Sequence, residues 1–221
     1  MGRIITALEI QAHDHERVSV YLDGEFAFGL SALEAVKLHK GQELSEAEIA
    51  ALQESDEVAR AFDQVVNLLA RRPYSTAEIR RHLANKHLAA PTIEEVLDRL
   101  IHLGYADDQA FASYWVENRE RFRPRGPRAL RYELRQKGIT DDLIETTLSE
   151  FDAHDAAYRA AQEQVRRLHH ISQPDFRQKI GAFLVRRGFE YDIVRAVIDQ
   201  LIHELEDEQP DYFIDHPTDE E

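Results

Sequence analysis

The chain has 221 residues, no cysteine and a formal net charge of −15 at pH 7. The lack of cysteine excludes disulfides and thiolate metal sites, and no stretch approaches the roughly 20 apolar residues of a membrane span. The strongly negative total argues against a protein that binds nucleic acid by its net charge alone. The N-terminus has no apolar run of the signal-peptide kind, so we expect a cytoplasmic protein.

Residues 1–56 are predicted to form a β-hairpin or three-stranded meander with short helices. Apolar residues alternate with other residues in three runs between positions 3 and 29, and Asp23-Gly24 between the last two runs is typical of a two-residue hairpin turn. Two short helices follow, over residues 32–39 and 46–54. Ser45 and Glu48 have the spacing of a capping box at the start of the second helix.

Three segments of the remaining chain align at offsets of 51 and 50 residues, with Ile79, Leu130 and Ile180 at one shared position. A period that holds over more than about twenty positions indicates a repeated structural unit. Each unit reads as three short helices, so we predict three-helix repeats over residues 57–106, 107–153 and 154–205. The predicted fold is mainly α, with the tandem repeats forming an elongated curved rod behind the β-rich N-terminal segment.

Several residues mark the expected ends of the repeat helices. Ser75 and Thr92 are predicted to begin the second and third helices of the first repeat. Gly138 and Gly188 follow a basic residue at matching positions, which is typical of a helix that ends in a left-handed residue. His87 occupies the same place in the first repeat, where it is less favourable than glycine.

The end of the chain, residues 206–221, is predicted to be a disordered acidic tail. From Glu204 to Glu221 there are nine acidic residues and no lysine or arginine. The segment also contains two prolines and almost no apolar periodicity, so it buries too little apolar surface to offset the entropy of ordering.

Charge of the opposite sign gathers in the second repeat, where eight basic residues face two acidic ones and give a local net charge of +6. Arginine presents a planar fork that suits phosphate and carboxylate groups, and aromatic residues are interleaved. We interpret the stretch as a partner- or DNA-binding surface, the alternative being a solvated face with local salt bridges. Its basic residues are Arg119, Arg121, Arg123, Arg125, Arg128, Arg131, Arg135 and Lys137.

The sequence carries no constellation typical of an enzyme. It has no Gly-x-Ser-x-Gly elbow, no phosphate-binding loop of the Walker A kind and no dinucleotide-binding glycine pattern. Its histidines are scattered, and no set of them is spaced like the ligands of a metal site. We therefore predict a protein that is not an enzyme and that needs neither cofactor nor metal.

Four segments resemble the RecX family of recombinase regulators. They are residues 69–79 (LARRPYSTAEI), 103–112 (LGYADDQAFA), 125–128 (RGPR) and 133–139 (ELRQKGI). The resemblance extends over most of the chain, from residue 57 to 205, and it is most specific in the second repeat. The β-rich N-terminal segment is expected to lie outside the minimal family pattern, although longer members of the family carry such extensions, and the acidic tail is also expected to be an addition.

The resemblance implies a monomeric regulator that binds RecA, and in particular the RecA filament on single-stranded DNA. Such a protein modulates, and usually inhibits, the ATPase, strand-exchange and coprotease activities of RecA, and so regulates DNA repair, recombination and the SOS response. The family offers no single site to transfer, so the eight basic residues above are chosen by local charge. The alternatives are an autonomous helix-turn-helix-like DNA-binding protein and a helical scaffold with an unrelated partner; the net charge of −15 disfavours the first.

Overall fold

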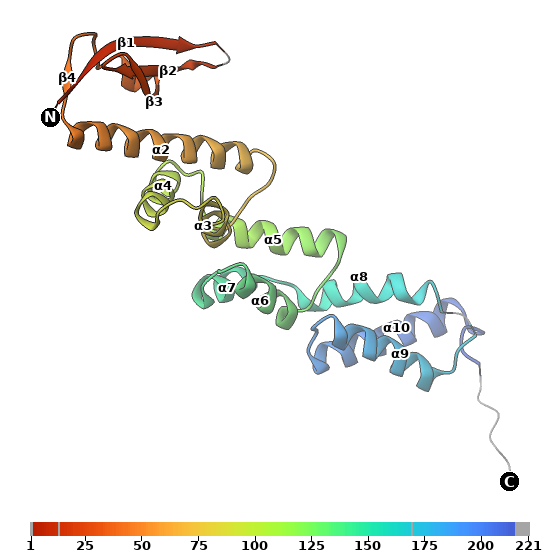
Figure 1. Ribbon diagram of the computed structural model, residues 1–221. Coiled ribbons are helices and arrows are strands. Elements are labelled where there is room, and N and C mark those ends of the chain that lie inside the picture. Colours follow the sequence, from red (N-terminus) through yellow and green to blue (C-terminus); the bar gives the residue numbers. More distant parts are fainter. Residues whose placement is uncertain (1, 13, 169, 215–221) are drawn as a thin grey trace. The chain divides into compact units, whose positions relative to one another are not determined.

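The computed structural model describes residues 2–12, 14–168 and 170–214, which fall into two compact units, Met1–Ala106 and Asp107–Glu221. The first unit contains the N-terminal sheet and the first repeat, and the second unit contains the other two repeats (Figure 1). The predicted three-helix repeats and β-rich N-terminal segment are confirmed.

The N-terminal sheet has four antiparallel strands in the order β3-β2-β1-β4 (Figure 1). Strands β1 (Arg3–Gln11), β2 (Asp14–Leu22) and β3 (Glu25–Ser31) form the predicted meander. Asp23 and Gly24 have φ angles of 53° and 92°, as the predicted hairpin turn requires. Strand β4 (Glu43–Leu44) was not predicted, because two residues are too few to show an alternating pattern.

Helix α1 (Ala32–Ala35) is shorter than the predicted helix over residues 32–39. The chain turns early because the N–H of Gly41 donates a hydrogen bond to the carbonyl of Ile5, 2.8 Å away, which brings the next residues onto β1 as β4. The alternating apolar residues of the sheet form one core with α1. The fully buried members of this core are Ile5, Val20, Leu22 and Leu30.

Helix α2 (Glu46–Leu69) joins the sheet to the first repeat, and it is longer than the predicted helix over residues 46–54. The predicted capping box of Ser45 and Glu48 is present, but the helix continues for 24 residues, since no glycine or proline interrupts it. Asp56 at its middle is buried and pairs with Arg17 of β2 at 2.9 Å and with Arg60 at 3.1 Å. Asp56 therefore anchors the middle of one continuous helix to the sheet.

The first repeat consists of the second half of α2, α3 (Thr76–Ala84) and α4 (Ala90–His102). Ser75 caps α3 as predicted, accepting a hydrogen bond from the N–H of Glu78 at 3.1 Å. Helix α4 begins three residues earlier than predicted, after Ala89 rather than after Thr92, because Pro91 suits its first turn. Thr92 is then not a cap, and its hydroxyl contacts Glu57 of α2 instead, at 3.3 Å.

The second repeat contains α5 (Asp108–Phe122), α6 (Pro127–Gln136) and α7 (Asp141–Leu148). The third contains α8 (Ala153–Val165), α9 (Gln173–Arg186) and α10 (Tyr191–Glu208). Leu83, Leu134 and Leu184, which the offsets align, are all fully buried, each in the core of its own repeat. Aligned positions in the sequence are therefore equivalent positions in the fold.

The end of the described chain corrects the prediction of a disordered tail from residue 206. Helix α10 runs to Glu208, and the following residues pack onto the third repeat. The hydroxyl of Tyr212 donates to the carbonyl of Leu168 at 2.8 Å, and the Phe213 ring lies 5.4 Å from that of Phe176. The rest of the predicted tail, residues 215–221, lies outside the described residues.

Candidate partner-binding surface

The predicted basic surface lies on α5, on α6 and on the loop between them. Helix α5 ends at Phe122, and the loop that follows turns through the buried residue Pro124. Gly126 then precedes α6, whose first turn holds Pro127. The loop is held from the third repeat, because the N–H of Gly126 donates to the carbonyl of Arg187 at 2.9 Å.

Glu133 of α6 organises the α5 side of this surface. Its carboxylate accepts a hydrogen bond from Arg119 Nε at 2.7 Å and another from the indole N–H of Trp115 at 2.9 Å. The guanidinium of Arg119 and the Nζ of Lys137 lie 4.3 and 4.7 Å from the Trp115 ring centre, where the face of the ring attracts cations. Arg125 Nε is more distant, 3.7 Å from the second oxygen of Glu133.

Two further arginines of α6 pair with carboxylates of α7. Arg131 binds Glu145 through two parallel hydrogen bonds of 2.8 and 3.0 Å, and Arg135 binds Asp141 at 2.7 Å. The net charge of +6 counted between Arg119 and Lys137 therefore does not describe the surface by itself. The partners of these two arginines lie beyond residue 137, outside the segment whose charge was counted.

Arg121, Arg123 and Arg128 differ from the other predicted residues, and we refer to them as the open arginines. All three are exposed, and none of them forms an ion pair with any described residue. Phe122 and Tyr132, each 65% exposed, lie on the same two helices. The guanidinium of Arg121 lies 5.3 Å from the Phe122 ring centre. Cations beside exposed aromatic rings are typical of surfaces that bind partners.

Arg187 of the third repeat belongs to the same region, although it is absent from the predicted set. Its Nη1 donates to the carbonyl of Pro124 at 3.1 Å. Burial and the positive charge of Arg125, and less so that of Arg123, lower the pKa of the Arg187 guanidinium, while Glu163 opposes them. The sequence signal that could have found it is its alignment with Lys137 at an offset of 50.

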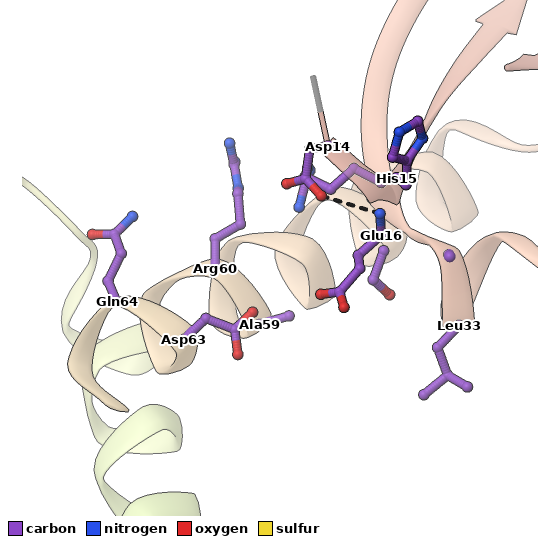
Figure 2. A pocket seen from close by; sticks show the side chains of 11 residues that line it. Asp14, His15, Glu16, Leu33, Ala59, Arg60, Asp63 and Gln64 are labelled. Carbon is purple, nitrogen blue, oxygen red and sulfur yellow. Dashed lines mark hydrogen bonds between the residues drawn. The ribbon is translucent and has the colours of Figure 1, made fainter. Parts of the chain in front are cut away.

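A pocket of about 580 Å³ in the first unit lies between the N-terminal sheet and α2. Figure 2 shows Arg60 and Asp63 on the α2 wall, with Asp14, Glu16 and Leu33 on the opposite wall. The pocket is lined by both acidic and basic side chains, so its charge does not favour a ligand of one sign. Within the described part of the chain, no group of three or more histidine or acidic side chains could hold a metal ion. There is also no helix in it that is long and apolar enough to cross a membrane.

Comparison with family models matches four segments in chain order. Residues 3–45 match "Regulatory protein RecX N-terminal domain", and residues 61–100, 107–148 and 152–198 match the first, second and third three-helix domains of RecX. The β-rich segment thus matches an N-terminal domain of the family, separate from its three-helix domains.

Individual relatives agree with these matches. The chain is 34% identical to "Regulatory protein RecX" of Bacillus subtilis (strain 168), covering 92% of this chain and 79% of the relative. A structure described as "Crystal structure of regulatory protein RecX" superposes with a TM-score of 0.73 at 27% identity, covering 89% of this chain and 99% of that one. RecX from Lactobacillus salivarius, at 24% identity, agrees in fold with a TM-score of 0.62, covering 67% of this chain and 99% of that one.

Proposed function

We propose, because the chain belongs to the RecX family of regulatory proteins, that it is a non-enzymatic regulator that binds RecA and the RecA filament on single-stranded DNA. Its predicted effect is inhibition of the ATPase, strand-exchange and coprotease activities of RecA. Through these activities it would regulate DNA repair, recombination and the SOS response. We further propose that it acts as a monomer in the cytoplasm, without cofactor or metal.

The observation that carries this proposal is the set of open arginines beside exposed aromatic rings on the second repeat. A guanidinium without an internal partner can bind a carboxylate or a phosphate without first breaking an ion pair. Arg119, Arg131 and Arg135 are already engaged within the repeat. Among the eight predicted residues, we therefore assign direct contact to Arg121, Arg123 and Arg128, and a positioning role to Arg119, Arg125, Arg131, Arg135 and Lys137.

Inhibition follows if the protein binds one state of the filament more tightly than another. A ligand shifts an equilibrium between two conformations only by its difference in affinity for them. If phosphates of the DNA take part in binding, the affinity falls as the salt concentration rises, because counterions are released. The net charge of −15 favours a protein partner as the main contact over bare DNA.

The ATPase of RecA on single-stranded DNA, measured as this protein is titrated in, tests the proposal. We expect inhibition at a protein concentration well below that of RecA, with weak binding to bare single-stranded DNA. Tight binding to bare DNA with no effect on the ATPase would support the autonomous DNA-binding alternative instead.

Charge reversal locates the contact surface. The triple substitution R121E/R123E/R128E is expected to weaken filament binding at least about tenfold, because each lost contact is a charge-assisted hydrogen bond. A matched control is R166E/R167E/K179E, which makes the same change of charge at exposed residues elsewhere in the second unit. Equal effects of the two triple variants would contradict the assignment of the open arginines. Circular dichroism of both variants verifies that they are folded.

A further inference from the structure

The three repeats differ on the face between their second and third helices. In the first repeat Arg80 of α3 binds Glu94 of α4 through two hydrogen bonds of 2.8 Å each. In the second repeat Arg131 and Glu145 make the same two bonds between α6 and α7. Arg80 and Arg131 are 51 residues apart in the sequence, and so are Glu94 and Glu145. Equivalent ion pairs therefore close the same face in the first and second repeats.

The third repeat lacks this ion pair. The offset of 50 places Gly181 of α9 where Arg131 stands, and Arg195 of α10 where Glu145 stands. One partner has therefore lost its side chain, and the other has changed sign. No ion pair can therefore form at these two positions, and α9 and α10 are linked by a different pair, Arg177 with Asp199.

The second ion pair of this face is also replaced in the third repeat. Arg135 and Asp141, which bind each other at 2.7 Å in the second repeat, correspond to Val185 and Tyr191. Val185 is 51% exposed and Tyr191 is 78% exposed. Two paired charged residues have thus been replaced by two exposed residues with large apolar parts on one face.

A groove of about 230 Å³ lies on this face of the third repeat. Val194 and Ile198, both nearly fully buried, line it together with Gly181, and Val185 and Tyr191 also contribute. The arginine that covers this face in the other two repeats, Arg80 or Arg131, is replaced here by Gly181. The space left by the missing side chain forms the groove.

Packing does not explain the glycine. A Cβ atom at position 181 would lie 3.6 Å from the Cδ1 of Ile198 and 4.0 Å from Val194, which are ordinary contacts. Glycine inside a helix lowers stability by about 0.5–1 kcal/mol relative to alanine. A residue that destabilises α9 without a need in the core points to a role for the space that it leaves.

The charged groups of the groove are unbalanced. Arg177 Nη1 lies 2.5 Å from one oxygen of Asp199, and Arg195 Nε lies 3.9 Å from the other. Two guanidinium groups therefore share one carboxylate, and the side chain of Arg195 is 74% exposed. The rim of the groove is positive, and its floor is apolar.

We propose that this groove is a docking site for an acidic peptide segment of a partner protein that carries one large apolar side chain. The apolar residue fills the hollow over Gly181 and contacts Tyr191, and a neighbouring carboxylate of the segment binds Arg195. This site is separate from the open arginines and does not depend on the proposed role of those residues.

Other occupants fit the groove less well. Residues 215–221 of this chain are acidic but contain no large apolar side chain. A second copy of the chain would need a stable interface of about 1,200 Å² or more, and two exposed apolar residues do not supply it. A nucleic acid strand carries phosphates at a regular spacing and has no isolated apolar side chain to fill the apolar floor formed by Val194 and Ile198.

Fluorescence anisotropy with a labelled peptide tests the proposal. The probe is a nonapeptide of acidic residues with one central phenylalanine, and its comparison is the same peptide with alanine at the centre. We expect saturable binding of the first peptide to the full chain, and binding at least about tenfold weaker for the alanine peptide, because a large apolar side chain is no longer buried.

The variant G181R/R195E closes the groove with the ion pair that the other two repeats already contain. We expect it to fold normally and to bind the phenylalanine peptide at least about tenfold more weakly than the natural chain. The matched control is K179E, which makes a charge reversal at an exposed residue of the same helix outside the groove, and which should change the affinity less than about threefold.

Three results would overturn the proposal. The first is that the phenylalanine peptide binds the natural chain no better than it binds the closed variant, whether both bind it or neither does. The second is binding of a single-stranded oligonucleotide that the closed variant loses, with peptide binding unaffected. The third is a dimer seen by sedimentation in the natural chain but not in the closed variant, with no peptide binding by either.

Discussion

The second and third repeats share a three-helix core but differ in how their surfaces use charge. Leu134 and Leu184 are equivalent and fully buried, so packing fixes these positions in both repeats. In contrast, the second repeat closes the face between α6 and α7 with ion pairs, and its open arginines lie on α5, on α6 and on the loop between them. The third repeat has no ion pair at the corresponding positions, where a groove is left, and a different pair, Arg177 with Asp199, links α9 to α10. The two repeats therefore share their buried positions but differ in the charged residues of their surfaces.

The contact between the two repeats can be broken at Gly188. This residue has a φ of +87°, and a Cβ atom there would lie 2.6 Å from the backbone nitrogen of Ala129 in the second repeat. We expect G188A to lower the free energy of unfolding by about 3 kcal/mol, from left-handed strain and overpacking together. Chemical denaturation measures the loss.

The control for this substitution is G104A. Gly104 also has a positive φ, of +73°, but a Cβ atom there would meet nothing within 4 Å. We expect a loss of about 1 kcal/mol, from the strain alone. Equal losses in the two variants would show that the close approach of the two repeats is not important for stability.

The third repeat, unlike the second, uses a following segment to complete its core, and truncation tests this difference. A chain that ends at Leu205 lacks Tyr212 and Phe213, and we expect it to be destabilised by about 2 kcal/mol, because the partly buried rings no longer cover Phe176. A chain that ends at Ile214 keeps both rings and should unfold like the full chain. Thermal unfolding of the two truncated chains compares them.

Changes to the ion pair between the second and third helices of a repeat should alter the free energy of unfolding less than the changes above. Removing the pair from the second repeat and adding it to the third should have effects of opposite sign. Removal of the Arg131 guanidinium in R131A should lower the free energy of unfolding by about 0.5 kcal/mol, as is usual for exposed pairs. The variant G181R/R195E should raise it by about 1 kcal/mol, mainly because arginine replaces a glycine inside a helix. Stabilisation by R131A, or destabilisation by G181R/R195E, would contradict the comparison.

The smallest predicted effect is the loss of the Arg131–Glu145 ion pair at low pH. The hydrogen bonds from Arg131 hold the pKa of Glu145 below its ordinary value of 4.5. The stabilisation from this pair is therefore complete above that value and is lost as the pH falls through the lowered pKa. Carboxyl NMR titration should show a depressed pKa for Glu145 that returns toward 4.5 in R131A. Glu94, whose pKa Arg80 lowers in the same way, serves as an internal control because R131A should leave it unchanged.

The repeats could be predicted from the sequence because buried positions recur. Leu83, Leu134 and Leu184 lie in register, and the left-handed residues that end the second helices also recur as His87, Gly138 and Gly188. The folded segment after Glu208 was missed because its acidic residues outweighed the apolar run of Tyr212, Phe213 and Ile214. That run was the available signal for the packing.

The candidate surface could be predicted only in part, because local charge does not reveal pairing across helices. Counting residues between Arg119 and Lys137 located the basic region, but the partners of Arg131 and Arg135 come from the next helix. The distinction between open and engaged arginines needed the structure. The groove of the third repeat could have been predicted from the alignment of the repeats. The first two repeats have an arginine and a glutamate at two aligned positions, where the third repeat has Gly181 and Arg195.

Helix α2 gives the first unit a mechanical property. Its early turns pack on the core of the sheet through Ile49 and Leu52, and its later turns pack in the first repeat through Ala61 and Val65. With 24 residues it extends about 36 Å. Because no glycine or proline interrupts α2, it offers no hinge between the sheet and the first repeat. A load applied to the sheet would therefore reach the first repeat through one continuous helix, and an optical-trap measurement on a chain tethered at both ends of this unit could show whether the sheet and the repeat unfold together.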